Sequence, residues 1–203
     1  MFPFDVILFD VGGVLLTNGW DTRERALAIE HFQLDAEGFE ARHHAAYPAW
    51  ERGAISLRAY LDETAFNVPR SFSQDEFFAF MLAQSKLLPD GALGTLKDLA
   101  ASNKCMLGAL NNEARETNKY RFETFALFGF FKVALTSCYL GLRKPDLAIF
   151  ERALDILGCP ANRILFIDDR PENVSAATQA GMKGIRFEGE ESLRSELVSL
   201  GVL

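Results

Sequence analysis

Residues 4–16 read FDVILFDVGGVLL, and this stretch decides the fold. Val6 to Phe9 form an unbroken apolar run of β-formers, which is typical of a strand covered on both faces. The run stops at Asp10, and Gly12 and Gly13 then let the backbone turn tightly. A carboxylate at the carboxyl end of a buried parallel strand lies where open α/β sheets bind their ligands. The alternative is a turn aspartate that only ends the strand.

Beyond residue 90 the sequence alternates between helical and strand patterns. Alternation of this length favours right-handed crossovers and a parallel sheet covered on both faces, so we predict a doubly wound α/β fold of Rossmann-like type. The expected strands are 105–110, 133–137, 164–167 and 184–187, and the expected helices are 93–102, 113–125, 146–157, 172–180 and 190–200.

Residues 17–89 contain no convincing strand pattern and predict a small helical insertion. Asp21 is expected to cap the first of its helices, with Glu24 completing a capping box. The other expected helices are 36–46, 57–66 and 74–84. The chain thus divides into a core domain, 1–16 and 90–203, and a helical cap domain, 17–89.

Composition limits the classes of function. The chain has 203 residues and a formal net charge of −7, which argues against a general nucleic-acid partner. No apolar run approaches the roughly 18 residues that a membrane span needs, and the start of the chain lacks a secretory signal pattern, so we expect a cytoplasmic protein with no membrane partner. The three cysteines show no metal-binding spacing and are expected to be reduced thiols.

Polar side chains follow three of the expected strands. Asp10 ends the first, Asn111 and Asn112 end the second, and Asp168 and Asp169 end a later one. Because the carboxyl ends of parallel strands share one edge of the sheet, these residues are expected to converge on a single crevice.

Three converging carboxylates would repel one another unless they share a cation, and Mg²⁺ prefers such hard oxygen ligands. The alternative for Asp168 and Asp169 is an acidic pair that caps the helix near Pro171. Lys144 could offset the charge of a phosphoryl group and its carboxylate acceptor. The alternative for Arg143 and Lys144 is a solvated basic pair.

The ordered set FDVGGVL, ALNNE, LRKPD and FIDDRPENV resembles the four motifs of the haloacid dehalogenase-like (HAD) hydrolase superfamily. The helical insertion after the first motif is similar to the C1-type cap of that superfamily. The resemblance covers nearly the whole chain, and its strongest parts are the first motif and FIDDRPENV.

The resemblance implies that Asp10 is a nucleophile that takes up the phosphoryl group, which is covalent catalysis by a carboxylate. It also implies that Mg²⁺ is held by Asp10, by the backbone carbonyl of Gly12 and by Asp169. Asp168 is expected in the inner shell of the metal or one water away. Asn173 matches a position that supports the site.

The resemblance further implies that Lys144 and Asn111 are catalytic beside Asp10. It also implies a larger set of residues that contact the phosphate and the rest of the substrate. The expected substrate-binding residues are Gly12, Gly13, Asn111, Asn112, Lys144 and Trp20. We expect Trp20 to line the substrate cleft because it lies close in sequence to the first motif.

The chain departs from the superfamily pattern at two positions. Phosphatases of the family usually carry a second aspartate two residues after the nucleophile as general acid/base, and this chain has Gly12 there. The loss of such a group typically costs about 10²- to 10⁴-fold in rate. Asn111 replaces the Ser or Thr of the second motif, although its amide can still donate a hydrogen bond to a phosphoryl oxygen.

Aromatic and imidazole side chains are frequent in the insertion. The polar surroundings of His31, His43 and His44 favour roles facing solvent, and core packing is the favoured role of Trp50. The phenylalanines of the insertion are expected in the cap core or in a subunit contact that would make a homodimer; among them are Phe77, Phe78 and Phe80.

We therefore expect a Mg²⁺-dependent hydrolase, a phosphatase that acts on a small phosphorylated metabolite through an aspartyl-phosphate. The first alternative is a 2-haloacid dehalogenase-type carbon–halogen hydrolase, which Gly12 suits but the acidic pair does not. The second alternative is a binding or regulatory protein of the same fold without turnover.

Overall fold

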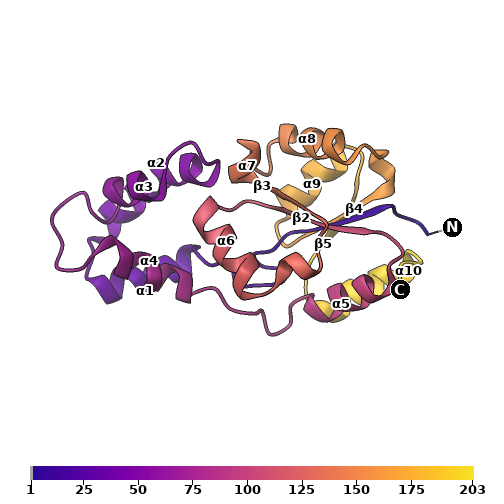
Figure 1. Cartoon of the computed structure of the whole chain (residues 1–203), viewed down its shortest axis with the longest axis horizontal. Coiled ribbons are helices and arrows are strands. Elements are labelled where there is room, and N and C mark those ends of the chain that lie inside the picture. Colours follow the sequence, from indigo (N-terminus) through magenta and orange to yellow (C-terminus); the bar gives the residue numbers. More distant parts are fainter. Residues whose placement is uncertain (1) are drawn as a thin grey trace.

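The structure is a computed structural model that describes residues 2–203 and has the predicted α/β architecture (Figure 1). In chain order its strands and helices are β1 (Val6–Phe9), α1 (Thr22–Phe32), α2 (Ala36–Glu51), α3 (Leu57–Glu63), α4 (Gln74–Ala83), α5 (Leu93–Ser102), β2 (Met106–Asn111), α6 (Arg115–Thr124), β3 (Val133–Thr136), α7 (Ser137–Leu140), α8 (Leu147–Leu157), β4 (Ile164–Asp168), α9 (Pro171–Gln179), β5 (Lys183–Arg186) and α10 (Glu190–Ser199). Short 3₁₀ turns occupy Leu127–Gly129 and Ala161–Arg163.

The five strands form one parallel sheet in the order β3-β2-β1-β4-β5, with β1 at its centre. Val6 is paired with Met106 of β2 on one side and with Ile164 of β4 on the other. The order reverses direction on either side of β1, so the carboxyl ends of β1, β2 and β4 meet at a topological switch point. Asp10 directly follows β1 at that point.

Alternate residues of β1 face two separate apolar cores. Ile7 and Phe9 pack in a cluster with residues of α5, α6 and α10, and Val6 and Leu8 pack in a second cluster with residues of α8 and α9. Figure 1 shows these two groups of helices on opposite faces of the sheet. A doubly wound sheet buried on both faces is thus confirmed.

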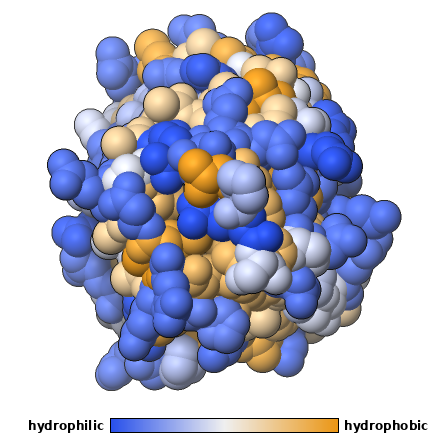
Figure 2. All heavy atoms as spheres, turned by 90° about the vertical axis from the view of Figure 1, so that its left-hand side faces the viewer, coloured by the Kyte–Doolittle hydropathy of each residue, from blue (hydrophilic) through white to orange (hydrophobic). Residues whose placement is uncertain are grey.

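Helices α1–α4 lie between β1 and α5 in sequence and gather beside the sheet (Figure 1). They share an apolar cluster of their own that includes Trp50, Tyr60 and Phe77. Phe78 and Phe80 pack against the same cluster, and apolar side chains are scattered among polar ones over the outer face of this region (Figure 2). This packing supports the predicted division at residues 17 and 89, which stays a prediction, as does a homodimer.

The predicted cap of α1 is present, since Asp21 and Glu24 form a capping box. The predicted end of the next helix at residue 46 is wrong, because α2 continues through Pro48 to Glu51. Burial of Trp50 in the cap core favours the longer helix over the local preference of proline. The short helix α7 was not predicted.

Among residues 2–203, no helix combines the length and the apolar character that crossing a bilayer would require.

Candidate active site

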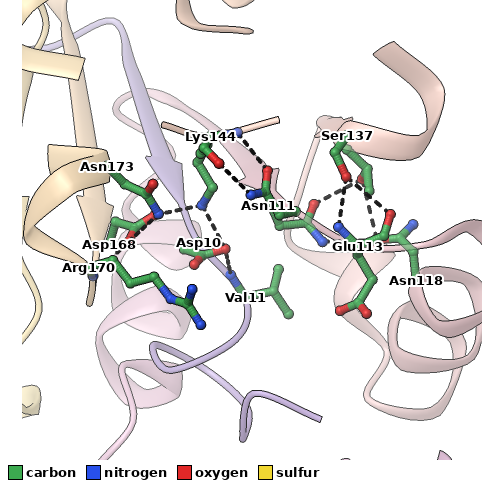
Figure 3. Close-up of polar contacts among 12 residues, drawn as sticks. Asp10, Val11, Asn111, Glu113, Asn118, Ser137, Lys144, Asp168, Arg170 and Asn173 are labelled. Carbon is green, nitrogen blue, oxygen red and sulfur yellow. Dashed lines mark hydrogen bonds and ion pairs between the residues drawn. The ribbon is translucent and has the colours of Figure 1, made fainter. Parts of the chain in front are cut away.

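Asp10 lies at the carboxyl end of β1 and is 8% exposed. Its backbone N–H donates to the carbonyl of Ile167, which continues the pairing with β4. The Val11 N–H donates to Asp10 Oδ1 at 2.8 Å, which fixes the rotamer of the carboxylate. The strand and its first turn therefore hold the predicted nucleophile in one orientation (Figure 3).

Lys144 joins the two buried carboxylates of the site. Its Nζ lies 3.0 Å from Asp10 Oδ1 and 2.6 Å from Asp168 Oδ2. The side-chain amide of Asn112 accepts from the Lys144 N–H and donates to the Lys144 carbonyl, both at 2.8 Å. Lys144 is only 2% exposed, so the alternative of a solvated basic residue is excluded for it. Asn112 acts on the site by holding the backbone of this lysine.

The carboxylate of Asp168 is fully buried and has partners on both oxygens. Oδ1 accepts the Arg170 N–H at 2.8 Å, and the Asn173 amide nitrogen lies 3.0 Å from each oxygen. With Lys144 on Oδ2, little coordination capacity is left on Asp168. Asn173 thus lies where a residue that supports the acidic cluster would be expected.

Asp169 differs from its neighbour, because its Oδ1 is buried and has no hydrogen-bond partner in the part of the chain that the structure describes. Gly13 makes room for this carboxylate. A Cβ at Gly13 would overlap the carboxylate of Asp169, and Gly13 has φ +72°. Only glycine satisfies both conditions, so the turn after β1 is shaped around Asp169.

Asp10, Asp168 and Asp169 each offer an oxygen, and these three oxygens lie within 4.8 Å of one another. A buried carboxylate oxygen without a donor is costly unless a cation or a water satisfies it. The donor set is all oxygen, which suits Mg²⁺. The residues therefore fit a magnesium ion, with Asp10 and Asp169 better placed to bind it directly than Asp168.

Burial dominates the electrostatics of the cluster. It raises the pKa of Asp10, with Lys144 opposing the rise and Asp168 adding to it. Burial and the adjacent Asp168 also raise the pKa of Asp169. Burial lowers the pKa of Lys144, but the two carboxylates beside it outweigh that effect and raise it overall. Lys144 is paired with Asp10 and Asp168, and the charge of Arg170 opposes the rise in the pKa of Asp169.

Asn111 does not point toward the position where it was predicted to contact a phosphoryl oxygen. Its Nδ2 donates to Asn118 Oδ1 at 3.1 Å, and its Oδ1 accepts from Thr136 Oγ1 at 2.9 Å. Asn111 is 1% exposed, and the structure directs its amide away from the Lys144 side of the cluster (Figure 3). Buried amides need partners on both ends, and α6 and β3 supply them here.

A cleft of about 370 Å³ lies between α1–α2 and the acidic cluster. Asp10, Gly12, Trp20, Asn112, Lys144 and Asn173 are among the residues that line it. Trp20 is 4% exposed and also packs in the cap core. The structure thus brings these predicted residues to one cavity. Four other predicted site residues lie outside its lining: Gly13, Asn111, Asp168 and Asp169.

Two polar side chains lie beside Gly12, on the side where a side chain at this position would extend. A Cβ at Gly12 would lie 2.9 Å from Asn18 Oδ1 and 3.9 Å from Arg121 Nη1. Arg121 is 2% exposed, donates to Glu113 Oε2 and donates to the Thr17 carbonyl at 2.6 Å. The side chains of Asn18 and Arg121 therefore take the space where a carboxylate at position 12 would point.

Several cleft residues were missed by the sequence reasoning. The expectation that His43 faces solvent is wrong, because it is 4% exposed and lines the cleft. Its spacing from Tyr47 and Glu51, four and eight residues along α2, was the available signal. Arg121 gave no signal, since a lone arginine in a polar-faced helix is normally exposed.

The family model described as haloacid dehalogenase-like hydrolase matches residues 4–181. The chain belongs to this family. The matched range includes the segments FDVGGVL, ALNNE, LRKPD and FIDDRPENV as well as the helical insertion.

Two curated relatives are named as a hydrolase and as a phosphatase. The chain is 42% identical over 66 residues to flavin mononucleotide hydrolase 1 of Arabidopsis thaliana, which covers 32% of the chain and 27% of that protein. It is 26% identical over 186 residues to sesquiterpene phosphatase astK of Aspergillus oryzae, with 91% and 90% covered. The chain also spans only 36% of drimenol cyclase drtB of Aspergillus calidoustus. Its HAD relatives therefore include much longer proteins.

Solved HAD structures share the fold at low identity. The HAD family enzyme bt-2542 of Bacteroides thetaiotaomicron superposes with a TM-score of 0.79 at 18% identity, over 97% of this chain and 99% of that one. Its complex with magnesium and inorganic phosphate gives a TM-score of 0.73 at 21% identity, over 92% and 95%. A 2-haloacid dehalogenase of Pseudomonas syringae gives 0.64 at 20% identity, over 97% and 99%.

Proposed function

We propose that this HAD-like hydrolase is a Mg²⁺-dependent phosphatase that acts on a small phosphorylated metabolite through an aspartyl-phosphate on Asp10. The observation that carries the proposal is the buried acidic cluster. Three carboxylates with oxygens within 4.8 Å of one another face one lysine, and one carboxylate oxygen, Asp169 Oδ1, lacks a donor among the described residues. A dehalogenase has no need of that arrangement, whereas a metal-dependent phosphatase does.

In the proposed reaction an oxygen of Asp10 attacks phosphorus, and the bond from phosphorus to the leaving oxygen breaks. Gly12 has no side chain to donate a proton, so the leaving alkoxide takes its proton from water in the cleft. A second water then attacks phosphorus and gives a proton to the hydroxide left by the first, the acyl-phosphate bond breaks, and inorganic phosphate and the Asp10 carboxylate are formed. Lys144 stabilises the Asp10 carboxylate and the phosphoryl charge at the start of this sequence.

Asp10, the Gly12 carbonyl and Asp169 would hold the metal, with Asp168 in the inner shell or one water away. The ion would supply charge neutralisation for the phosphoryl oxygens and the attacking carboxylate. The magnesium and phosphate complex of the similar bt-2542 enzyme supports this choice of metal. Because Asp169 Oδ1 is the free acceptor, Asp169 is the residue on which metal binding should depend most.

Four more residues have proposed roles around the phosphate. Gly13 keeps the turn open for the carboxylate of Asp169 and for a close phosphate. Asn112 holds the backbone that carries Lys144. Trp20 would contact the leaving group from the cap side of the cleft. Asn111 would reach a phosphoryl oxygen only after its amide leaves Asn118, so we assign it the weakest contribution.

Product analysis tests the proposal. Sugar phosphates, nucleotides and p-nitrophenyl phosphate are incubated with the protein in Mg²⁺ or in a chelator, and inorganic phosphate is measured. The proposal predicts release from at least one class of substrate, and loss of that release in the chelator. Release that is undiminished by chelation would contradict the role of the metal.

A second function is favoured by one observation, the absence of an acid at position 12. Carbon–halogen hydrolysis by Asp10 needs no such acid, and 2-haloacid dehalogenases share the fold. Chloride release from a 2-haloacid in the presence of chelator, with no phosphate release from any ester, would decide for it. Tight binding of Mg²⁺ and phosphate without either reaction would instead identify a regulatory protein.

A further inference from the structure

The face of α2 that lines the cleft is polar and aromatic. His43, Tyr47 and Glu51 lie four residues apart and therefore on one side of the helix, and all three line the cleft. His43 and Glu51 are each 4% exposed. Buried polar groups need hydrogen-bond partners. Donors and acceptors of these side chains that have no partner in the protein therefore indicate which groups a bound molecule must present.

A chain of hydrogen bonds favours one tautomer of His43. Trp20 Nε1 is a donor only, and it donates to the Tyr60 hydroxyl oxygen at 2.8 Å. His43 Nδ1 lies 2.8 Å from the same oxygen, so it is the partner to which Tyr60 can donate its hydroxyl proton. In this arrangement Nδ1 accepts, and the neutral ring carries its proton on Nε2.

The ring stays neutral at the pH of cells. Burial lowers the pKa of His43 to about 3, and the charge of Arg25 and the neighbouring His44 act in the same direction. Asp21 opposes this shift but is outweighed. Among residues 2–203 the His43 ring has a hydrogen-bond partner at Nδ1 alone, and the residue lines the cleft, so Nε2–H is left as a donor for a molecule bound there.

Arg143 and Glu51 form a second pair that lines the cleft, and this pair includes a hydrogen-bond donor without a partner among the described residues. Arg143 Nη2 lies 2.7 Å from Glu51 Oε2, yet Glu51 Oε2 and Arg143 Nε are both buried without a hydrogen bond to the described residues. Glu51 Oε2 is ion-paired with Nη2, whereas the Arg143 Nε–H is a donor without a partner among the described residues and matches an oxygen acceptor such as a hydroxyl or carbonyl group. A hydrocarbon there would leave this N–H unsatisfied.

We propose that His43 is a specificity-determining residue whose Nε2–H binds a hydroxyl or carbonyl oxygen on the leaving group of the substrate. The substrate is then an oxygen-rich phosphomonoester, such as a polyol or sugar phosphate, and not a phosphorylated hydrocarbon. This inference rests on the proposed function. It separates this chain from its sesquiterpene phosphatase relative in substrate while keeping the chemistry at Asp10.

The test compares kcat and KM for glycerol phosphate and hexose phosphates with those for alkyl phosphates of similar size and for phenyl phosphate. The His43→Phe variant keeps a ring but has no N–H. We expect it to raise KM about tenfold for the oxygen-rich esters, as the loss of one hydrogen bond in a dry site does, and to leave phenyl phosphate within about twofold. The matched control is His31→Phe, since His31 lies in the cap outside the cleft lining and stacks on Phe80.

Equal losses for oxygen-rich and hydrocarbon esters, or no preference between them in the unmodified protein, would overturn the inference. If no ester is hydrolysed at all, the proposed function fails. A binding measurement then still tests the inference about His43. In the Asp10→Asn variant, the ¹⁵N resonances of the His43 ring should show protonated Nε2 and should shift when glycerol phosphate is added. An Nδ1-protonated ring, or no shift at saturating glycerol phosphate, would overturn it.

Discussion

Glycine at position 13 brings the first turn of the chain into contact with the end of β4. Gly13 has φ +72°, and its Cα faces the carboxylate of Asp169 where a Cβ would overlap it. Asp169 is held in place by this contact and not by a hydrogen bond to Oδ1. The orientation of the proposed metal ligand therefore depends on the absence of a side chain 156 positions earlier.

Gly13→Ala should weaken metal binding far more than it weakens the fold. The positive φ costs about 1 kcal/mol, and displacement of the Asp169 carboxylate should reduce Mg²⁺ affinity at least about tenfold. Calorimetric titration with Mg²⁺ measures the affinity. The control is Gly141→Ala, because Gly141 has φ +71° but an added Cβ meets no described atom within 4 Å. Equal Mg²⁺ affinities in the two variants would contradict the account.

For single residues, the sequence predicted which residues belong to the site better than it predicted where their side chains point. Asp10 and Asp169 lie together as the ends of parallel strands require, and Lys144 reaches Asp10 from the loop before α8. Asn111 was expected to face the phosphate, but Asn118 and Thr136 hold its amide elsewhere. His43 was expected in solvent, but Tyr60 and the cap core bury it. Both errors come from partners distant in sequence, which a local pattern does not contain.

At the scale of elements, α6 ties the second motif to the segment that follows the first. Arg121 extends from α6, pairs with Glu113 and donates to the carbonyl of Thr17. Both members of the ion pair are less than 10% exposed. Removing one charge of such a buried pair leaves the other without compensation, so this contact should matter for stability.

Arg121→Met should lower the free energy of unfolding by about 3 kcal/mol, because the buried Glu113 carboxylate then keeps only the Thr117 hydroxyl as a partner among the described residues. Urea denaturation at constant m measures the change. The matched control on the same helix is Lys119→Met, whose side chain is 71% exposed and which should change stability by less than about 0.5 kcal/mol. A loss for Arg121→Met no larger than that of the control would show that the pair contributes nothing.

The sequence largely predicted which segments form helices and which form strands. It predicted less well where each of them begins and ends. The five strands and their parallel arrangement follow from apolar runs that alternate with helical periodicity. Helix α2 runs past Pro48 because Trp50 packs in the cap core, and the start of α6 lies at Arg115 and not at Glu113. Tertiary packing decides such boundaries, and periodicity alone does not.

At the scale of the whole molecule, contacts between cap and core close the cleft on two sides. Arg170 of the core pairs with Asp21 at 3.0 Å on one side. On the other, the Ser137 hydroxyl donates to the Glu51 carbonyl at 2.7 Å. The acidic cluster joins the ends of β1 and β4 on the sheet side of this cleft. A cation bound to these carboxylates would hold the two strand ends together and would therefore stabilise the folded chain.

Mg²⁺ should therefore raise the melting temperature of the chain. A ligand at 100 times its dissociation constant adds about 2.7 kcal/mol, which for a chain of this size corresponds to roughly 5–10 °C. Thermal unfolding over a series of Mg²⁺ concentrations measures the shift. Asp169→Asn should abolish it, whereas Asp146→Asn, at an exposed helix start without a side-chain cap, should not. The same shift in both variants would remove Asp169 from the metal site.

The most direct test of the central claim is phosphate release by Asp10→Asn beside the unmodified protein and Asp146→Asn, in Mg²⁺ and with the best substrate of the panel. The account predicts that release falls to the background rate in Asp10→Asn alone, because an amide cannot serve as the nucleophile. Undiminished release by Asp10→Asn would contradict the assignment of Asp10 and with it the proposed mechanism.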